Sequence, residues 1–289
     1  MAIFHYSQKP VARGRGQSAV AGAAYRAADK LYDHRVGQWF DYERRRGVVH
    51  TEIVLPTEAA KRDINWARNR QQLWNAAEAA ERRKDSRVAR EHEVALPHEL
   101  QKEQHIALLR AFAGEIANRY QVAVDFALHK PHRQGDARNF HAHVYATTRQ
   151  VGPTGLGDKA SIELSNTDRA KRGLVASKVE ITAMRARWGE LVNEHLALRG
   201  IEARVDHRSL KAQGDRAHAD HASGAGGHGD GAARDRDAGG TAGGRAAAAR
   251  SPGPARAGRR ARAPGTRAEP DREVDCGFIR GAGRCAAGA

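Results

Sequence analysis

Three histidines near the middle of the chain have the spacing of a metal site. Residues 121–149 read as two strands joined by a polar loop, because apolar residues alternate with other residues on both sides of residues 130–139. If the strands pair as a hairpin, His129 at the end of the first lies beside His141, and His143 follows on the same face. Three converging imidazoles suit a divalent metal that keeps coordination positions open for a substrate.

Two alternatives to this metal site stay open from the residues alone. A His-x-His pair on a strand is often a polar surface pair, and His132 in the loop is a second candidate for the third ligand. The ligand type also leaves the ion open, since imidazole favours Mn, Zn, Co or Ni over Mg.

Two carboxylates and one tyrosine are further candidates for chemistry. Glu91 and Glu93 share one face of a strand expected at residues 87–96, where they could orient metal-bound imidazoles or take a proton. The alternative is a solvated sheet edge. Tyr25 is the large uncharged side chain within an alanine-rich helix expected at residues 17–30, and filling the core is its simplest role from the residues alone.

These residues need a scaffold of both helices and strands. Besides the hairpin, the patterns predict strands at residues 2–6, 48–55 and 87–96, and helices at residues 17–30, 63–84, 99–119 and 179–198. Residues 8–16 are predicted to form a basic loop, and residues 151–159 a glycine-rich, mobile segment.

Composition indicates the class of partner and compartment. The chain of 289 residues has a formal net charge of +15, so a polyanion is the expected partner. The two cysteines, Cys276 and Cys285, lie near the end of the chain and imply no disulfide framework, which fits a reducing compartment. No apolar run is long enough for membrane insertion.

The composition changes near Gly214, which divides the chain into residues 1–214 and 215–289. The second part is rich in Ala, Gly and Arg and lacks Leu, Met, Trp and Tyr, so we expect a disordered low-complexity tail. A basic DNA-holding tail and a flexible linker are alternatives. Our favoured hypothesis is a frameshifted or truncated C-terminus, read out of frame from GC-rich DNA, which the gene sequence tests.

Four segments in order resemble the MobA/MobL-type (MOBQ) relaxases, plasmid-mobilisation nickases of the HUH endonuclease superfamily. They are AIFHYSQKPVARGRGQSAVAGAAYRAADKLYD at residues 2–33, ERRKDSRVAREHEVALPHEL at 81–100, HKPHRQGDARNFHAHVYATTR at 129–149 and DHRSLKAQG at 206–214. The resemblance implies an α+β fold for residues 1–214: an antiparallel-sheet HUH relaxase domain with flanking helices.

The resemblance also implies roles for the candidate residues. Tyr25 aligns with the family's nucleophile, and Tyr32, about two helical turns further on, is a weaker candidate. The three histidines align with the metal ligands, and Mg or Mn is the implied ion. Glu91 and Glu93 align with the acidic pair, with neither role assigned.

The implied function is a site- and strand-specific DNA nickase and strand transferase at a plasmid transfer origin. It would form a 5′-phosphotyrosyl intermediate on single-stranded or locally melted origin DNA, in the bacterial cytoplasm. Relaxosome accessory proteins and a type IV secretion coupling protein are the implied partners. The alternatives are another HUH enzyme, such as a rolling-circle replication initiator or transposase, and a non-catalytic basic DNA-binding protein.

Overall fold

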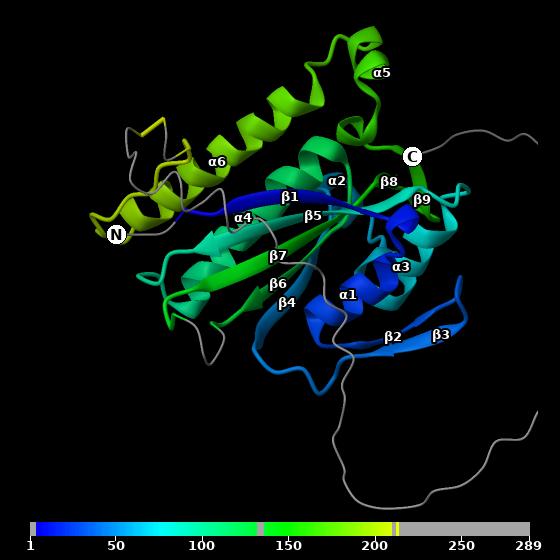
Figure 1. Cartoon of the computed structure of the whole chain (residues 1–289), viewed down its shortest axis with the longest axis horizontal. Helices are drawn as coiled ribbons and strands as arrows, with labels where there is room; N and C mark the ends of the chain where they lie inside the picture. The colour runs from blue at the N-terminus through cyan, green and yellow to red at the C-terminus, as the bar shows by residue number, and fades with distance from the viewer. Residues whose placement is uncertain (1–3, 132–135, 210–211, 214–289) are drawn as a thin grey trace, which may run out of the picture. The chain divides into compact units, whose positions relative to one another are not determined.

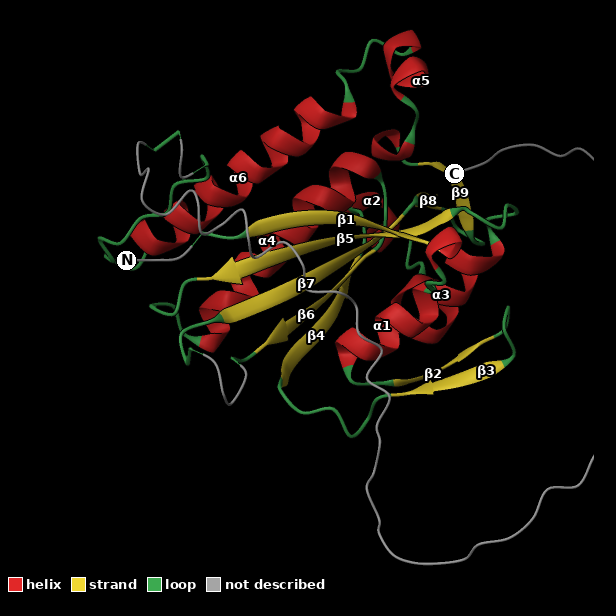
Figure 2. Ribbon diagram, in the orientation of Figure 1, coloured by secondary structure: helices red, strands yellow, loops and turns green. Residues whose placement is uncertain are grey.

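A five-stranded antiparallel sheet forms the centre of the protein (Figures 1 and 2). The structure, a computed structural model, describes residues 4–131, 136–209 and 212–213, so His132 and the expected tail at 215–289 lie outside the described residues. The strand order is β1-β5-β7-β6-β4. The strands are β1 (Tyr6–Ala12), β4 (Val48–Val54), β5 (Arg87–Leu96), β6 (Val124–His129) and β7 (Phe140–Thr147).

One face of the sheet packs against two long helices, α4 (Lys102–Tyr120) and α6 (Ser177–Ala197). The alternation expected for β6 and β7 is confirmed, because Phe126 and Val144 are fully buried on this face. Trp188 of α6 packs against Phe112 of α4 in a tilted arrangement, with ring centroids 4.9 Å apart, and joins the two helices to the same core. The strand at 87–96 and the amphipathic helix near 99–119 are also confirmed.

The opposite face is covered in part by α1 (Ala19–Ala27) and α3 (Arg70–Ala79), as Figure 2 shows. Tyr145 and Trp74, whose ring centroids are 4.4 Å apart, lie buried between the sheet and these helices. The helices do not cover this face completely. The histidine-bearing end of β7 and the edge strand β4 remain partly exposed.

Residues 2–3 of the strand predicted at 2–6 lie outside the described residues, and residues 4–5 are not in a strand. β1 begins at Tyr6 and continues to Ala12, through the residues expected to form a basic loop. Pro10 is compatible with a strand here because β1 is an edge strand, whose outward-facing positions need no ladder hydrogen bond.

Three other boundaries differ from the predictions for local reasons. The alanine-rich helix ends at Ala27 because Ala28 adopts the left-handed conformation, with φ of 52°, and the chain then forms β2 (Lys30–Asp33) and β3 (Gln38–Asp41). The helix predicted at 63–84 is interrupted by Asn69, which has extended backbone and caps α3 by accepting from the Gln72 amide. The glycine-rich segment forms the hairpin of β8 (Arg149–Val151) and β9 (Leu156–Lys159).

The remaining elements are short connections around the sheet. They are η1 (Arg13–Arg15), α2 (Thr57–Lys61), η2 (Asn65–Arg68), η3 (Ser161–Glu163) and α5 (Asn166–Lys171). No helix in the described part of the chain is both long and apolar enough to cross a bilayer.

Candidate active site

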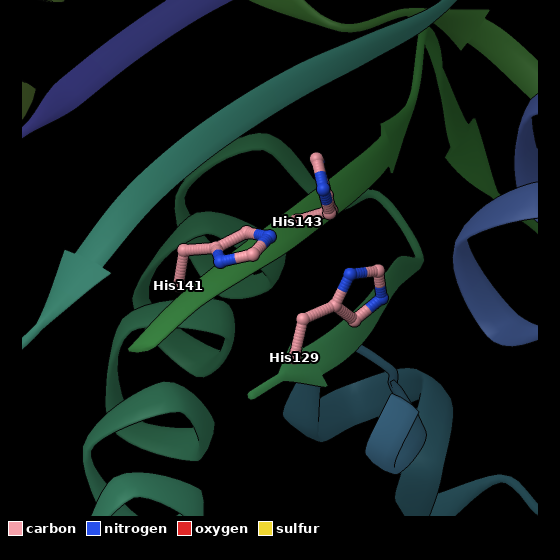
Figure 3. A group of neighbouring side chains, drawn as sticks. All are labelled: His129, His141 and His143. Carbon is pink, nitrogen blue, oxygen red and sulfur yellow. The ribbon is translucent and has the colours of Figure 1, made fainter. Parts of the chain in front are cut away.

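The three predicted ligands lie together at the end of the β6–β7 hairpin, where their rings point toward one another (Figure 3). His129 pairs directly with His141 in the antiparallel register, and His143 follows two residues later on the same face. One ligand nitrogen from each ring lies within 4.8 Å of the others. A metal ion bound through bonds of about 2.1 Å would need these nitrogens to converge on it.

Hydrogen bonds on the far side of each ring select the nitrogen that faces inward. The backbone carbonyl of Arg26 only accepts, so Nε2 of His129 donates to it at 2.8 Å and Nδ1 keeps the lone pair. Nδ1 of His143 lies 2.6 Å from a carboxylate oxygen of Glu91, which leaves Nε2 as its ligand atom. Nδ1 of His141 lies 3.4 Å from the Asn139 carbonyl, a weaker contact with the same result.

Burial keeps two of these rings neutral at pH 7. Desolvation lowers the pKa of His129 to about 3, with smaller contributions from the charges of His143, Arg45 and His141. Desolvation also lowers the pKa of His141, with help from His143. A neutral imidazole holds a free lone pair, so the protonation state, the tautomers and the convergence all fit a divalent metal.

Glu91 connects the histidines to α1. Burial by itself raises its pKa, but hydrogen bonds from His143 and Arg26, and the charge of Arg26, hold that pKa well below its ordinary value. The Arg26 guanidinium binds both carboxylate oxygens, with Nε 2.6 Å from Oε1. Glu91 therefore stays ionised and orients His143 as a hydrogen-bond acceptor.

Glu93 has a different environment from Glu91, although both side chains leave the strand on the same face. It forms a loose pair with Lys9 of β1 at 3.8 Å, and its side chain is 34% exposed. A pair with this exposure contributes little to stability. Glu93 lies opposite His143 in the β5–β7 register and its charge raises the pKa of His141, but among the described residues only Glu91 is hydrogen-bonded to a candidate ligand.

Tyr25 lies on α1, one residue before the carbonyl that binds His129. The Ser18 side chain caps the helix as a hydrogen-bond acceptor for the Ala21 amide. The Tyr25 side chain is 44% exposed and meets Tyr42 edge to face, so it does not fill the core. Its ring is covered by the Arg45 guanidinium, 3.9 Å from the ring centroid.

Tyr32 does not share a helix face with Tyr25, which corrects the helical spacing assumed for it. It lies in β2, beyond the left-handed turn at Ala28, opposite Trp39 of β3. Its backbone is held by the side chains of Gln71 and Asn75 from α3.

Two arginines were not predicted as site residues. Arg26 joins α1 to both Glu91 and His129, and Arg45 lies against Tyr25 while its charge contributes to the lowered pKa of His129 and His141. Arg45 belongs to a run of three arginines, and Arg26 directly follows Tyr25. The run of arginines and the position next to Tyr25 are visible in the sequence, but neither feature predicts which residues Arg45 and Arg26 contact.

Comparison with known proteins gives consistent results. Residues 17–228 match the model of the MobA/MobL family. The chain is 37% identical over 238 residues to the mobilization protein MobL of Acidithiobacillus ferridurans, and 34% identical over 229 residues to the conjugal transfer protein TraA of Agrobacterium fabrum. A solved structure described as the molecular basis of vancomycin resistance transfer in Staphylococcus aureus is 29% identical, with a TM-score of 0.57, and covers 72% of this chain and 100% of that one.

The alignments cover a larger share of this chain than of its relatives. The MobL alignment covers 75% of this chain but 60% of MobL, and the TraA alignment covers 74% of this chain but 20% of TraA. The chain thus spans only part of the length of these relatives. The family match covers well over half of the sequence, and this chain therefore belongs to the MobA/MobL family.

Proposed function

We propose that the protein is a metal-dependent DNA relaxase that nicks one strand at a plasmid transfer origin, with Tyr25 as the nucleophile. The observation that carries the proposal is the contact of α1 with the histidines. Nε2 of His129 donates to the carbonyl of Arg26, the residue that directly follows Tyr25, and Arg45 lies over the Tyr25 ring. The half-exposed phenol and the three imidazoles therefore belong to one neighbourhood at the end of the sheet.

The proposed reaction is a transesterification. The Tyr25 oxygen attacks the phosphorus of one phosphodiester, a phosphorus–oxygen bond to tyrosine forms, and the bond to the 3′ oxygen breaks. The phenolic proton is lost and the 3′ oxygen gains a proton, so the products are a 3′-hydroxyl and a 5′-phosphotyrosyl ester. Because the ester keeps the phosphodiester bond energy, the reverse attack by a 3′-hydroxyl can rejoin a strand.

His129, His141 and His143 are the proposed ligands of a divalent ion, with Mg or Mn as the proposed identity. When bound, such an ion supplies Lewis-acid stabilisation of charge on phosphate oxygens. Glu91 keeps Nε2 of His143 free for this role, and Arg26 holds Glu91 in place. Arg45 adds a positive charge where the phosphate approaches Tyr25.

The proposed substrate is origin DNA that is single-stranded or locally melted, since a paired strand cannot bring its phosphate against a tyrosine on a helix. The net charge of +15 favours such a polyanion. Accessory proteins of the relaxosome and a coupling protein of type IV secretion remain proposed partners, in the bacterial cytoplasm. The mobilisation and conjugal-transfer names of the relatives support this setting.

Trapping the covalent adduct tests the proposal. The full chain is incubated with Mn²⁺ and single-stranded oligonucleotides that tile the DNA flanking its gene, and adducts are mapped by peptide mass spectrometry. We expect an adduct on the peptide that contains Tyr25, and none in Tyr25→Phe. Tyr32→Phe and Tyr42→Phe are matched controls that remove a phenol nearby and should keep the adduct. An adduct that persists in Tyr25→Phe refutes the assignment.

A further inference from the structure

An open groove lies on the same side of the sheet as the histidines, between the β2–β3 hairpin, the edge strand β4 and the start of α3. Its volume is about 640 Å³, within the range of ~300–1,000 Å³ that is usual for ligand clefts. The residues that line it are Asp29, Lys30, Leu31, Trp39, Thr51, Glu52, Ile53, Arg68, Asn69, Arg70 and Gln71.

The wall formed by the hairpin presents an aromatic ring to solvent. The Trp39 side chain is 59% exposed, although a ring of this size is normally buried. The Tyr32 ring packs against it in a tilted arrangement, with ring centroids 5.2 Å apart, and the Lys30 ammonium lies over the indole, 5.5 Å from its centroid. An exposed indole with a cation beside it is the arrangement on which nucleic-acid bases stack.

The hairpin is held in place before any ligand binds. Gln71 of α3 donates to the Tyr32 carbonyl at 2.6 Å and accepts from the Tyr32 amide at 2.8 Å. Asn75 donates to the same carbonyl and accepts from the amide of His34. A fixed wall reduces the entropy lost when a flexible ligand binds.

Most charged residues of the groove already have partners. Asp29 shares Arg70 with Asp125, which Arg70 binds through both carboxylate oxygens, while Lys30 pairs with Asp41 at 3.3 Å and Glu52 with Arg110 at 2.8 Å. Arg68, by contrast, is exposed and forms no ion pair within the described part of the chain. It therefore provides a cation for a backbone phosphate close to the ring of Trp39.

The groove is also close enough to the histidines for one DNA strand to contact both. β4 pairs with β6 so that Val48 lies opposite His129 and Thr51 opposite Ala127, and Thr51 lines the groove. Ala127 and His129 are two residues apart along β6, a rise of about 7 Å, which a few nucleotides of extended DNA can bridge.

We propose that this groove binds single-stranded DNA next to the segment held at the histidines, with one base stacked on Trp39 and a phosphate at Arg68. The inference rests on the proposed function, because it adds a second contact region for the same DNA. A base-stacking contact away from the reacting phosphate holds the strand in register without taking part in the bond changes.

The test measures the affinity of the full chain for a fluorescein-labelled single-stranded oligonucleotide by anisotropy, at several salt concentrations. Trp39→Ala should weaken binding about 5- to 100-fold, the effect expected for loss of one stacked base, while Trp39→Phe should keep most of the affinity. Arg68→Gln should weaken binding and lower the slope of log affinity against log salt by about 0.7.

Val36→Ala in the same hairpin and Arg62→Gln on the surface are matched controls outside the groove, and both should bind like the wild type. Circular dichroism and thermal melting identify any variant that fails to fold, and Trp39→Phe then decides the role of the ring.

Wild-type affinity in Trp39→Ala would overturn the proposal and indicate a protein partner for the groove. If the wild type forms the Tyr25 adduct while Trp39→Ala binds single-stranded DNA with wild-type affinity, the groove proposal is refuted and the proposed function is retained. If Trp39→Ala weakens DNA binding but the wild type forms no adduct, the groove proposal is supported and the proposed nickase function is refuted.

Discussion

Glu91→Gln tests whether the carboxylate orients a metal ligand. Glu91 accepts hydrogen bonds from Nδ1 of His143 and from the guanidinium of Arg26. Glutamine has nearly the same shape, but one of its terminal atoms is an amide nitrogen that donates. The amide nitrogen then faces either His143 or Arg26, and both of these groups are donors. The substitution therefore removes a charge-assisted contact on at least one side.

The size of the effect follows from these contacts. If the amide oxygen stays with His143, the ring keeps its orientation but loses the negative charge that makes it a stronger ligand. If the oxygen turns to Arg26, Nδ1 of His143 loses its acceptor and the ring is free to change tautomer. Loss of such an outer hydrogen bond weakens metal binding by about 10- to 100-fold, which corresponds to about 1.4–2.7 kcal/mol.

Isothermal titration of Mn²⁺ into the wild type, Glu91→Gln and Glu93→Gln measures this difference. Glu93→Gln is a matched control on the same strand and face. It loses a loose pair with Lys9 and a charge that raises the pKa of His141, but no hydrogen bond to a candidate ligand among the described residues. We therefore expect a smaller loss of affinity for this control than for Glu91→Gln. Imidazole nitrogen shifts in NMR spectra should show a changed His143 tautomer in Glu91→Gln alone. Equal Mn²⁺ affinities for the two variants would refute the orienting role of Glu91.

Two further predictions concern the packing that supports the site. A Cβ at Gly22 would lie 2.5 Å from the Tyr145 hydroxyl, so Gly22→Ala should destabilise the fold by about 1–2 kcal/mol in urea unfolding, despite its better helix propensity. That hydroxyl is buried and has no hydrogen-bond partner among the described residues, so Tyr145→Phe should cost little and should relieve part of the Gly22→Ala effect. Burial lowers the pKa of His92 to about 3, with help from Arg90. In the unfolded state His92 binds a proton below about pH 6.5, whereas in the folded state it stays neutral until about pH 3. The free energy of unfolding should therefore decrease as the pH is lowered through this window. Between pH 7.5 and 5, His92 alone should account for a loss of about 2 kcal/mol, which His92→Gln should abolish in unfolding titrations at both values.

Period-two patterns predicted the parts of the site that depend on one hairpin. His129 and His141 lie opposite each other because both end their strands beside the same loop, and alternation then fixes the face of His143. Glu91 follows by the same rule, since β5 pairs with β7. The histidine relations need only strand periodicity and the pairing of one hairpin, which the sequence indicates, whereas the position of Glu91 also needs the β5–β7 pairing, which only the structure gives.

The contacts of Arg26 and Arg45 could not be predicted in this way. They depend on how closely α1 approaches the sheet and on the path of the chain after β3, and neither is encoded in a local period. The β2–β3 hairpin was missed for a related reason. Alanine propensity favours continuing the helix, whereas the left-handed Ala28 and the contacts of Gln71 and Asn75 end it.

The small residues of α1 connect the two halves of the proposed site. Ala23 and Ala24 are buried, and Gly22 leaves room for the Tyr145 hydroxyl, so the helix backbone lies close to the sheet. This approach lets the Arg26 carbonyl accept from His129, which fixes the histidine tautomer. The preceding residue, Tyr25, is at the same time half-exposed. The alanine-rich composition thus places a backbone acceptor against the candidate metal ligand and an accessible phenol one residue away, and a larger side chain at either alanine would separate them.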